Sequence, residues 1–429
     1  MALAEILLVA VAVLMLLAVP VAFSLIAAAV IAILWVGGIN LMIVPQQVIS
    51  GVDSLLLLAI PFFLLAGDLM TAGGMTDRLL AFTNAILGRF RGGLAMSNVA
   101  SATFMSGISG SAVADTSALG RVLIPAMVKE GYSPGFAAAL TAAANIVGPI
   151  IPPSITFVII GVLTNLSVTR LFLAGVFPGF LYAAVMLAMA WWISRVRAYP
   201  VHGKSSGAEI RRTFRAAFWA LMMPVLIIVG IRTGVFNVTE CSAVAVLYAL
   251  AVGTLAYREL TPKLIMQALV RTARTTAVIM LVIGGAQAMS WLLAYQNVPQ
   301  QVADWMLAAT TNPLVFLFLV NVFLLLIGTF LENGPALVML APVLYPIAAK
   351  LGIDPIHFSM VIALNLVLGL ITPPVAISLA IGSLIARVPS REVTREVVPF
   401  FMAAMGVLAV VTFVPAVSLW LPNLLMGKG

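Results

Sequence analysis

Long apolar runs, separated by short polar or Gly- and Pro-rich stretches, fill almost the whole chain. Roughly 20 apolar residues span the hydrocarbon core of a bilayer, and the chain offers about ten such segments. The N-terminal part predicts apolar helices at residues 2–19, 21–36 and 54–70. Residues 76–87 are amphipathic but too short and too polar to span, so we expect an arm that lies along the membrane surface.

The next two apolar segments are each interrupted near the middle. Residues 94–127 are long enough to cross a membrane, but they carry many Ser and Thr residues and the helix-breaking stretch 107–111. Basic residues at both ends predict a re-entrant hairpin that enters and leaves on one side. Residues 134–163 predict a helix broken at 145–153, where two adjacent prolines remove amide donors and exclude a regular turn before them.

The rest of the chain repeats this alternation of spans and breaks. We expect spans at 171–193, 218–231, 242–256, 275–294 and 397–421, a surface arm at 260–274, a hairpin at 313–347 interrupted at 328–335, and a broken helix at 355–386 interrupted at 369–374. Broken backbone at membrane depth is tolerated only where protein or water covers it. The four interruptions therefore predict a site inside the protein.

Residues 107–153 occur twice in the chain. Shifting the sequence by 221 positions aligns them with residues 328–374 without a gap and with 13 identities in 47 positions. Shared apolar letters mean little in so hydrophobic a chain, but glycines, prolines and a lysine also match in register, Gly148 with Gly369 among them. We interpret this as an internal structural repeat, which in a membrane protein points to a transporter.

The charge of the chain is unevenly spread. With 22 Lys and Arg against 14 Asp and Glu the net charge is +8. Most basic residues fall in five clusters, at 78–91, 121–129, 195–215, 258–274 and 387–395. Because cytoplasmic loops are enriched in Lys and Arg, we interpret the clusters as topology and not as nucleic-acid binding, with the loop 194–215 in the cytoplasm. One hairpin then opens inward and the other outward, so the two repeats have inverted topology and a binding site lies near the bilayer midplane.

Composition excludes several classes of protein. The 429 residues are 63% hydrophobic and 8% charged, against about 25% charged in soluble domains, so the chain is an all-α polytopic membrane protein. The single cysteine, Cys241, excludes a disulfide framework and argues against a thiol site or a transition-metal site. The sequence has no Walker-type motif for ATP and no catalytic constellation, so we expect neither an ATP-driven pump nor an enzyme, and no cofactor.

Each interruption supplies groups that bind ions. Unwound backbone frees carbonyl oxygens, which suit a hard cation such as sodium, while helix N-termini and hydroxyl groups suit a carboxylate. Gly and Pro could instead merely kink packed helices, but their repetition in register argues against that interpretation. Glu332 is either a proton carrier or an acid at a water-facing hairpin tip, and Asp115 is either functional or a structural acid near a helix end.

The stretch 106–120, Ser-Gly-Ile-Ser-Gly-Ser-Ala-Val-Ala-Asp-Thr-Ser-Ala-Leu-Gly, resembles a family signature. Together with Gly148 before paired prolines, Leu331-Glu332 and Thr372 before paired prolines, it is similar to the large membrane subunit of tripartite ATP-independent periplasmic (TRAP) transporters. The resemblance covers essentially the whole chain. It implies a secondary transporter in the bacterial inner membrane that imports an organic anion, a carboxylate or sugar acid, with sodium ions as coupling ions and by an elevator mechanism.

The resemblance also implies site residues by motif position. The first sodium site would use Ser106, Ser109, Gly148, Ile151 and Pro153, and the second Gly328, Gly369, Thr372 and Val375. Most of these contribute carbonyl oxygens. The substrate would lie between the hairpin tips, near Ser109, Ser111, Asn145, Glu332 and Asn333.

The elevator mechanism divides the chain into two units. Residues 94–165 and 313–386 would form the moving transport unit, and residues 1–93, 166–312 and 387–429 the scaffold. The implied partners are a small four-helix membrane subunit and a soluble periplasmic protein that delivers the substrate. Two alternatives stay open: a stand-alone sodium- or proton-coupled anion transporter of a related elevator fold, and a proton-conducting subunit of a redox complex, which the few intramembrane ionisable residues disfavour.

Overall fold

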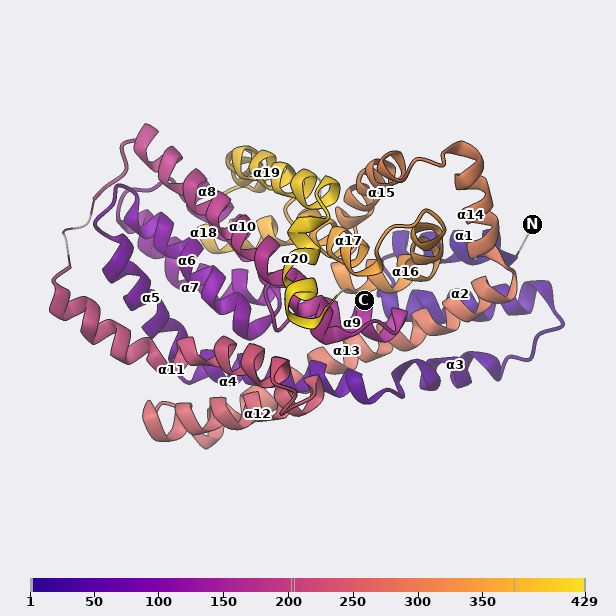
Figure 1. Ribbon diagram of the computed structural model, residues 1–429, viewed down its shortest axis with the longest axis horizontal. Coiled ribbons are helices and arrows are strands. Elements are labelled where there is room, and N and C mark those ends of the chain that lie inside the picture. The colour runs from indigo at the N-terminus through magenta and orange to yellow at the C-terminus, as the bar shows by residue number, and fades with distance from the viewer. Residues whose placement is uncertain (1–2, 202, 204, 374, 428–429) are drawn as a thin grey trace.

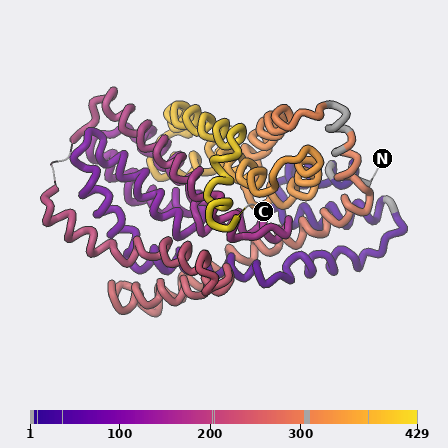
Figure 2. The backbone as a smooth tube through the Cα atoms, in the orientation of Figure 1, coloured from indigo at the N-terminus to yellow at the C-terminus, as the bar shows by residue number. Residues whose placement is uncertain are grey.

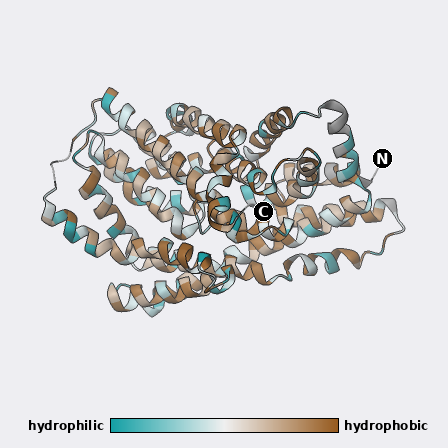
Figure 3. Ribbon diagram, in the orientation of Figure 1, coloured by the Kyte–Doolittle hydropathy of each residue, from teal (hydrophilic) through white to brown (hydrophobic). Residues whose placement is uncertain are grey.

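The computed structural model describes residues 3–201, 203, 205–373 and 375–427. All regular elements in these ranges are helices, and a single isolated bridge joins Arg91 to Val201. Six helices of the described part are long and apolar enough to cross a membrane, and seven shorter ones are apolar. Figure 3 shows apolar residues along most of the helices. The all-α membrane class is confirmed.

The N-terminal helices form one side of the molecule with the long helix α13. Their bounds are α1 Leu3–Leu16, α2 Val21–Val36, α3 Ile43–Val52, a 3-10 turn Leu55–Leu58 and α4 Ala59–Ala72. The break at Pro20 lies where the sequence predicts it, because proline cannot continue the first helix. Helix α3 was not predicted; it packs with α2 against α13, Pro262–Tyr295 (Figure 1).

The first repeat is built as the sequence predicts, with one shifted boundary. The elements are α5 Met75–Leu87, α6 Gly93–Ser109, α7 Ala112–Lys129, α8 Pro134–Asn145, α9 Ile155–Thr164 and α10 Val168–Val196. The hairpin break predicted at 107–111 is confined to Gly110 and Ser111. Helix α6 continues through Gly107 because this glycine is buried against Pro224 of α11, where a Cβ would lie 2.7 Å from the proline ring.

Two expectations for the middle of the chain are wrong. The elements are α11 Gly207–Arg232, α12 Val238–Ala251, a π turn Val252–Ala256, α13 and α14 Val298–Ala309. The arm at 260–274 and the span at 275–294 are one helix, which Figure 2 traces without interruption, since neither Gly nor Pro occurs between Pro262 and Gly284. The loop 194–215 shrinks to about ten residues because α10 and α11 extend into it.

The second repeat follows the first at the predicted offset. Its elements are α15 Pro313–Gly328, α16 Asn333–Lys350, α17 Pro355–Gly369 and α18 Ile377–Ala386, followed by α19 Ser390–Phe413 and α20 Ala416–Met426. Both ends of α16 lie 221 positions after the ends of α7, and Gly131 and Gly352 both have positive φ, 91° and 71°. The last span predicted at 397–421 is found as α19, which is long and apolar enough to cross a membrane, but its predicted end is wrong, because Pro415 separates α19 from α20. Pro374 of the predicted repeat lies outside the described residues.

Helices α8 and α17 form the centre of the molecule. Each is buried from its second residue to its end. They occupy equivalent positions in the two repeats, and each precedes an interruption. Both interruptions are therefore held by core helices and not by mobile surface loops.

Contacts among polar residues bring the basic clusters to one face, which we call the basic face. Arg78 forms an ion pair with Glu259 at 2.7 Å, and Arg91 pairs with the loop before α11. Arg197 lies 2.7 Å from Glu396, and this hydrogen bond raises the pKa of the arginine. Residues from three of the five clusters thus meet, and Glu396 directly follows a fourth, as expected if these clusters share one side of the membrane.

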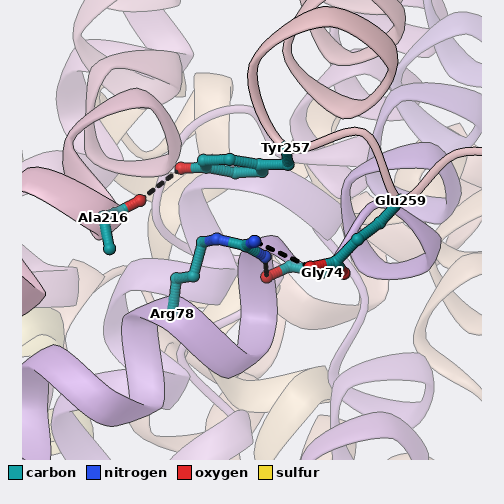
Figure 4. Close-up of polar contacts among 5 residues, drawn as sticks. All are labelled: Gly74, Arg78, Ala216, Tyr257 and Glu259. Carbon is teal, nitrogen blue, oxygen red and sulfur yellow. Dashed lines mark hydrogen bonds and ion pairs between the residues drawn. The ribbon is translucent and has the colours of Figure 1, made fainter.

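The Arg78 contact is the most elaborate of these (Figure 4). The guanidinium donates to the carbonyl oxygen of Gly74 at 2.7 Å and lies 3.9 Å from the centre of the Tyr257 ring. The Tyr257 hydroxyl donates to the carbonyl of Ala216 at 2.6 Å. One arginine of the arm α5 thus joins the start of that arm, the loop that carries Glu259 and helix α11.

Candidate functional site

The tip of the first hairpin holds a buried acid. Helix α6 ends at Gly110, whose φ of 63° is left-handed, and Ser111 caps α7 by accepting from the amide of Ala114 at 3.4 Å. The Ser109 hydroxyl donates to Asp115 Oδ1 at 2.5 Å. Asp115 is 1% exposed, and its Oδ2 accepts no hydrogen bond from the described residues. An unpartnered carboxylate oxygen therefore faces the interior beside the tip.

This tip lies directly against the first interruption, between α8 and α9. A Cβ at Gly110 would lie 2.7 Å from the carbonyl oxygen of Pro153. A Cβ at Gly148 would lie 3.2 Å from the amide nitrogen of Ala112 and 3.2 Å from Asp115 Oδ2. Both glycines are needed because any side chain would separate the tip from the interruption.

The predicted residues of the first sodium site have different roles here. The carbonyl oxygens of Gly148, Ile151 and Pro153 accept no hydrogen bond from the described residues. The Ile151 side chain lies against Gly179 of α10, so only its carbonyl is available. Ser106 is buried, and its hydroxyl donates to the carbonyl of Thr103 at 2.6 Å, which leaves its lone pairs free to accept or to ligate.

The second hairpin meets the second interruption in the same way but more closely. A Cβ at Gly369 would overlap the backbone of Gly328, and a Cβ at Gly328 would lie 3.2 Å from the Cα of Gly369. Within the described residues, the carbonyls of Gly328, Thr372 and Val375 accept no hydrogen bond, whereas the carbonyl of Gly369 accepts from the Thr372 amide at 3.0 Å. The Thr372 hydroxyl donates to the carbonyl of Leu368 at 2.8 Å. Two of the four predicted residues are thus in direct contact.

A cavity of about 320 Å³ lies between the two hairpin tips, and we call it the substrate cavity. Ser111, Glu332 and Asn333 of the predicted substrate residues line it. Ser109 and Asn145 lie outside its wall. Asn145 is fully buried and donates to the Thr141 carbonyl at 2.8 Å, so the structure gives it a place in the core.

Two polar residues of the substrate cavity were missed by sequence reasoning. Thr156 of α9 accepts a hydrogen bond from the Asn333 side-chain amide at 2.9 Å, which ties the second tip to the first repeat. Thr275 of α13 also lines the cavity. Each helix carries other threonines that do not line the cavity, so nothing in the local pattern marks these two.

Three helix N-termini border this cavity. Helices α7, α9 and α16 begin at Ala112, Ile155 and Asn333, and all three residues line the wall. Helix N-termini carry unsatisfied amides and a partial positive charge, which favour anions. The Glu332 side chain is exposed, lines the same wall and forms no capping hydrogen bond. The arrangement offers hydroxyl, amide and helix-end donors to an anion, with one acid nearby.

The fold and site define a class before any comparison. An all-helical membrane chain, in which two hairpin tips and two interrupted helices enclose a polar cavity, has the construction of a secondary transporter. The chain belongs to the family described as "Tripartite ATP-independent periplasmic transporter, DctM component", whose profile matches residues 8–417. This is a family of transporter permeases and not an enzyme class, and it places the chain in the inner membrane.

Named relatives agree with this assignment. The chain is 40% identical to the sialic acid TRAP transporter large permease protein SiaM of Vibrio cholerae, over 96% of each chain. It is 37% identical to the 2,3-diketo-L-gulonate TRAP transporter large permease protein YiaN of Escherichia coli, over 92% of this chain and 93% of that one. It is 38% identical to the C4-dicarboxylate TRAP transporter large permease protein DctM of Pseudomonas aeruginosa, over 86% of each.

The fold is similar to those of two transporters of low sequence identity. The YdaH transporter of Alcanivorax borkumensis superimposes with a TM-score of 0.60 and 16% identity, over 84% of this chain and 85% of that one. MtrF of Neisseria gonorrhoeae gives 0.57 and 13%, over 86% and 84%. At these identities the likeness concerns the fold alone.

Proposed function

We propose that this large permease subunit imports an organic anion, a carboxylate or sugar acid, together with sodium ions. The observation that carries the proposal is the convergence of three helix N-termini on one cavity. Each N-terminus is equivalent to about half a positive charge. The anions named for the similar permeases, sialic acid, diketogulonate and C4-dicarboxylates, all carry carboxylates that such a cavity would favour.

Sodium coupling is supported by the carbonyl groups behind the hairpin tips. Three predicted carbonyls at each interruption have no hydrogen-bond donor among the described residues. Four of these residues are buried, Gly148, Ile151, Pro153 and Gly328, whereas Thr372 is half-buried and Val375 exposed. Buried carbonyls are normally paired, and unwound carbonyls in such folds coordinate sodium. The oxygen-rich donor set fits this cation. At the first interruption Asp115 would add a negative charge to the neutral carbonyls.

The proposed transport mechanism is an elevator movement, in which one part of the chain slides against another. Residues 94–165 and 313–386 would move as one transport unit, and the rest of the chain would form the scaffold. The two hairpins would have inverted topology, with the basic face and the residues 194–215 in the cytoplasm. A small four-helix membrane subunit would extend the scaffold, and a periplasmic binding protein would deliver the anion.

A stand-alone anion transporter coupled to sodium or protons is the second candidate. Glu332 favours proton coupling in this case, because it lines the substrate cavity and would repel an anion unless protonated. In the sodium-coupled transporter, Glu332→Gln preserves the sodium dependence of uptake. In the proton-coupled transporter, the same variant abolishes the response to a proton gradient.

The deciding experiment is uptake of a panel of radiolabelled organic acids into proteoliposomes that hold this chain and its small partner subunit. A sodium gradient is imposed or omitted, and the periplasmic binding protein is added or left out. Uptake that needs both supports the tripartite transporter and identifies the cargo. Sodium-driven uptake without the binding protein supports the stand-alone transporter. Uptake that follows protons and ignores sodium overturns both sodium sites.

A further inference from the structure

A second cavity of about 280 Å³ adjoins the substrate cavity, and we call it the arginine cavity. Residues 64–71 of α4 and 114–121 of α7 contribute to its walls, together with Arg271 of α13. Leu64 lines both cavities. At the tip of the first hairpin, Ser109 lines the arginine cavity, while the next two residues line the substrate cavity. This tip and Leu64 therefore lie where the two spaces meet.

The arginine cavity lies on the side of the basic face. Helix α7 lines the substrate cavity at Ala112 and the arginine cavity as far as Arg121, about 14 Å further along the helix at 1.5 Å per residue. Helix α13 lines the substrate cavity at Thr275 and the arginine cavity at Arg271, which lies nearer the basic N-terminal end of that helix. On α4, the residues that line only the arginine cavity lie nearer the C-terminal end, which precedes the Arg78 contact. All three helices therefore lead from the substrate cavity to the basic face.

Of the two arginines that line this cavity, one has an acidic partner among the described residues and the other has none. Arg271 Nε lies 3.6 Å from Asp68 Oδ2, which also accepts from the Thr272 hydroxyl at 3.2 Å. The second acid, Asp115, is buried and accepts from a serine. Arg121 is exposed and forms no ion pair or hydrogen bond with the described residues. One guanidinium thus faces the cavity unpaired, and another is held by an acid that an incoming anion could displace.

We propose that the arginine cavity is a second binding station for the transported anion on its way to the cytoplasm. Arg121 receives the carboxylate or sulfonate as it leaves the substrate cavity. Arg271 joins when the anion replaces Asp68, because a guanidinium binds planar oxyanions through two parallel hydrogen bonds. Arg121 belongs to the hairpin and Arg271 to α13, so the station forms only between transport unit and scaffold. The inference rests on the proposed function for the nature of the cargo.

A cysteine at the wall reports the electrostatic potential directly. Ser117→Cys is introduced into the full chain carrying Cys241→Ala, and the purified protein is treated with methanethiosulfonate reagents that carry either a sulfonate or a trimethylammonium group. The thiolate attacks the reagent sulfur, a mixed disulfide forms, and methanesulfinate leaves. Each rate is divided by that of a free small thiol. Ala118→Cys, on the same wall, replaces Ser117→Cys if that variant does not fold.

The proposal predicts opposite effects for two changes. Arg121→Gln lowers the ratio of anionic to cationic labelling by about a hundredfold, because one charge at about 6 Å changes each rate about tenfold, in opposite directions, at an effective dielectric constant near 40. Asp68→Asn frees Arg271 and raises the ratio. Arg274→Gln is the matched control, because this exposed arginine of α13 does not line the cavity, and it leaves the ratio unchanged.

The outcomes separate this proposal from the proposed function. An unchanged ratio in Arg121→Gln, or an equal change in Arg274→Gln, overturns the station. The anionic reagent is itself a small organic sulfonate, so the labelling can be interpreted even when no cargo has been found. If labelling follows the prediction and uptake of every organic acid fails, the anion station stands and the proposed transport function falls.

Discussion

The contact between Gly328 and Gly369 offers the sharpest test of how the second hairpin is held. Both residues are buried, and their backbones touch without any side chain between them. The substitution Gly369→Ala adds one methyl group at this contact. Its Cβ would overlap the carbonyl group of Gly328, which is backbone and cannot rotate away as a side chain can. The hairpin must therefore move away from α17.

The free-energy cost of the added methyl group follows from this geometry. Overpacking a rigid core costs about 1–3 kcal/mol, and we expect the upper end because both neighbours are backbone atoms. About 3 kcal/mol corresponds to a roughly 150-fold loss in the population of the closely packed state. Gly406→Ala in α19 is the matched control, because a Cβ there meets nothing within 4 Å. Alanine is about 1 kcal/mol better than glycine inside a helix, so the control is neutral or stabilising.

Two measurements check this prediction. Thermal unfolding of the purified complex gives a lower Tm for Gly369→Ala than for Gly406→Ala, and the rise of Tm on adding sodium is lost in the first variant only. Both variants also enter the uptake assay, where only the control keeps sodium-driven transport. If Gly369→Ala unfolds at the same temperature as the control and keeps its response to sodium, the hairpin does not depend on this contact and the reasoning is refuted.

Three further changes test other contacts. Ser109→Ala removes the hydrogen-bond donor to Asp115 and leaves that buried carboxylate unpaired. We expect at least about a tenfold loss of sodium affinity, measured by sodium-dependent thermal shift. Ser109→Thr should restore most of the affinity, because it keeps the hydroxyl group. A double-mutant cycle on Asn333→Ala and Thr156→Ala should show a coupling of about 1 kcal/mol in unfolding, and additive effects would disprove the hydrogen bond between tip and α9. Arg78→Gln should lower stability by about 1 kcal/mol, and Arg78→Lys should recover only part because it keeps the charge but loses the planar stacking on the ring; equal stability of wild type and Arg78→Gln would contradict this.

Most elements of the fold could be predicted from the sequence, because glycine and proline mark their boundaries. The hairpins and interrupted helices were found because Gly and Pro repeat in register, and the structure gives α7 and α16 matching ends. Prediction failed where no glycine or proline marks a boundary. The arm at 260–274 and the span at 275–294 were predicted as separate elements, but both lie in α13, and the charged residues between them do not end a helix. The short helix α3 has no side-chain cap at its N-terminus, and tertiary packing decides it.

The candidate site was predictable only as far as it is made of backbone. Gly148 and Gly369 were found because the family motif and the repeat both mark them. Thr156 and Thr275 could not be found, since their role depends on which helices face the hairpin tips. Asn145 was placed near the substrate, yet it lies in the core outside the cavity wall, where its side-chain amide donates to the Thr141 carbonyl. Side-chain participation in a cavity is a tertiary property, which a motif does not contain.

The first hairpin tip and the interruption beside it are linked energetically. A helix broken at membrane depth leaves carbonyls that lipid cannot satisfy, and Gly148, Ile151 and Pro153 show such carbonyls beside the Ser109 tip. A bound cation would satisfy them and hold the tip against the interruption. The same tip supplies the helix N-terminus that borders the substrate cavity. Cation binding would therefore order the wall that binds the anion, so each ligand would raise the affinity for the other. Coupling between the proposed sodium ion and the proposed anion would need no long pathway, because one hairpin tip would separate the two ligands.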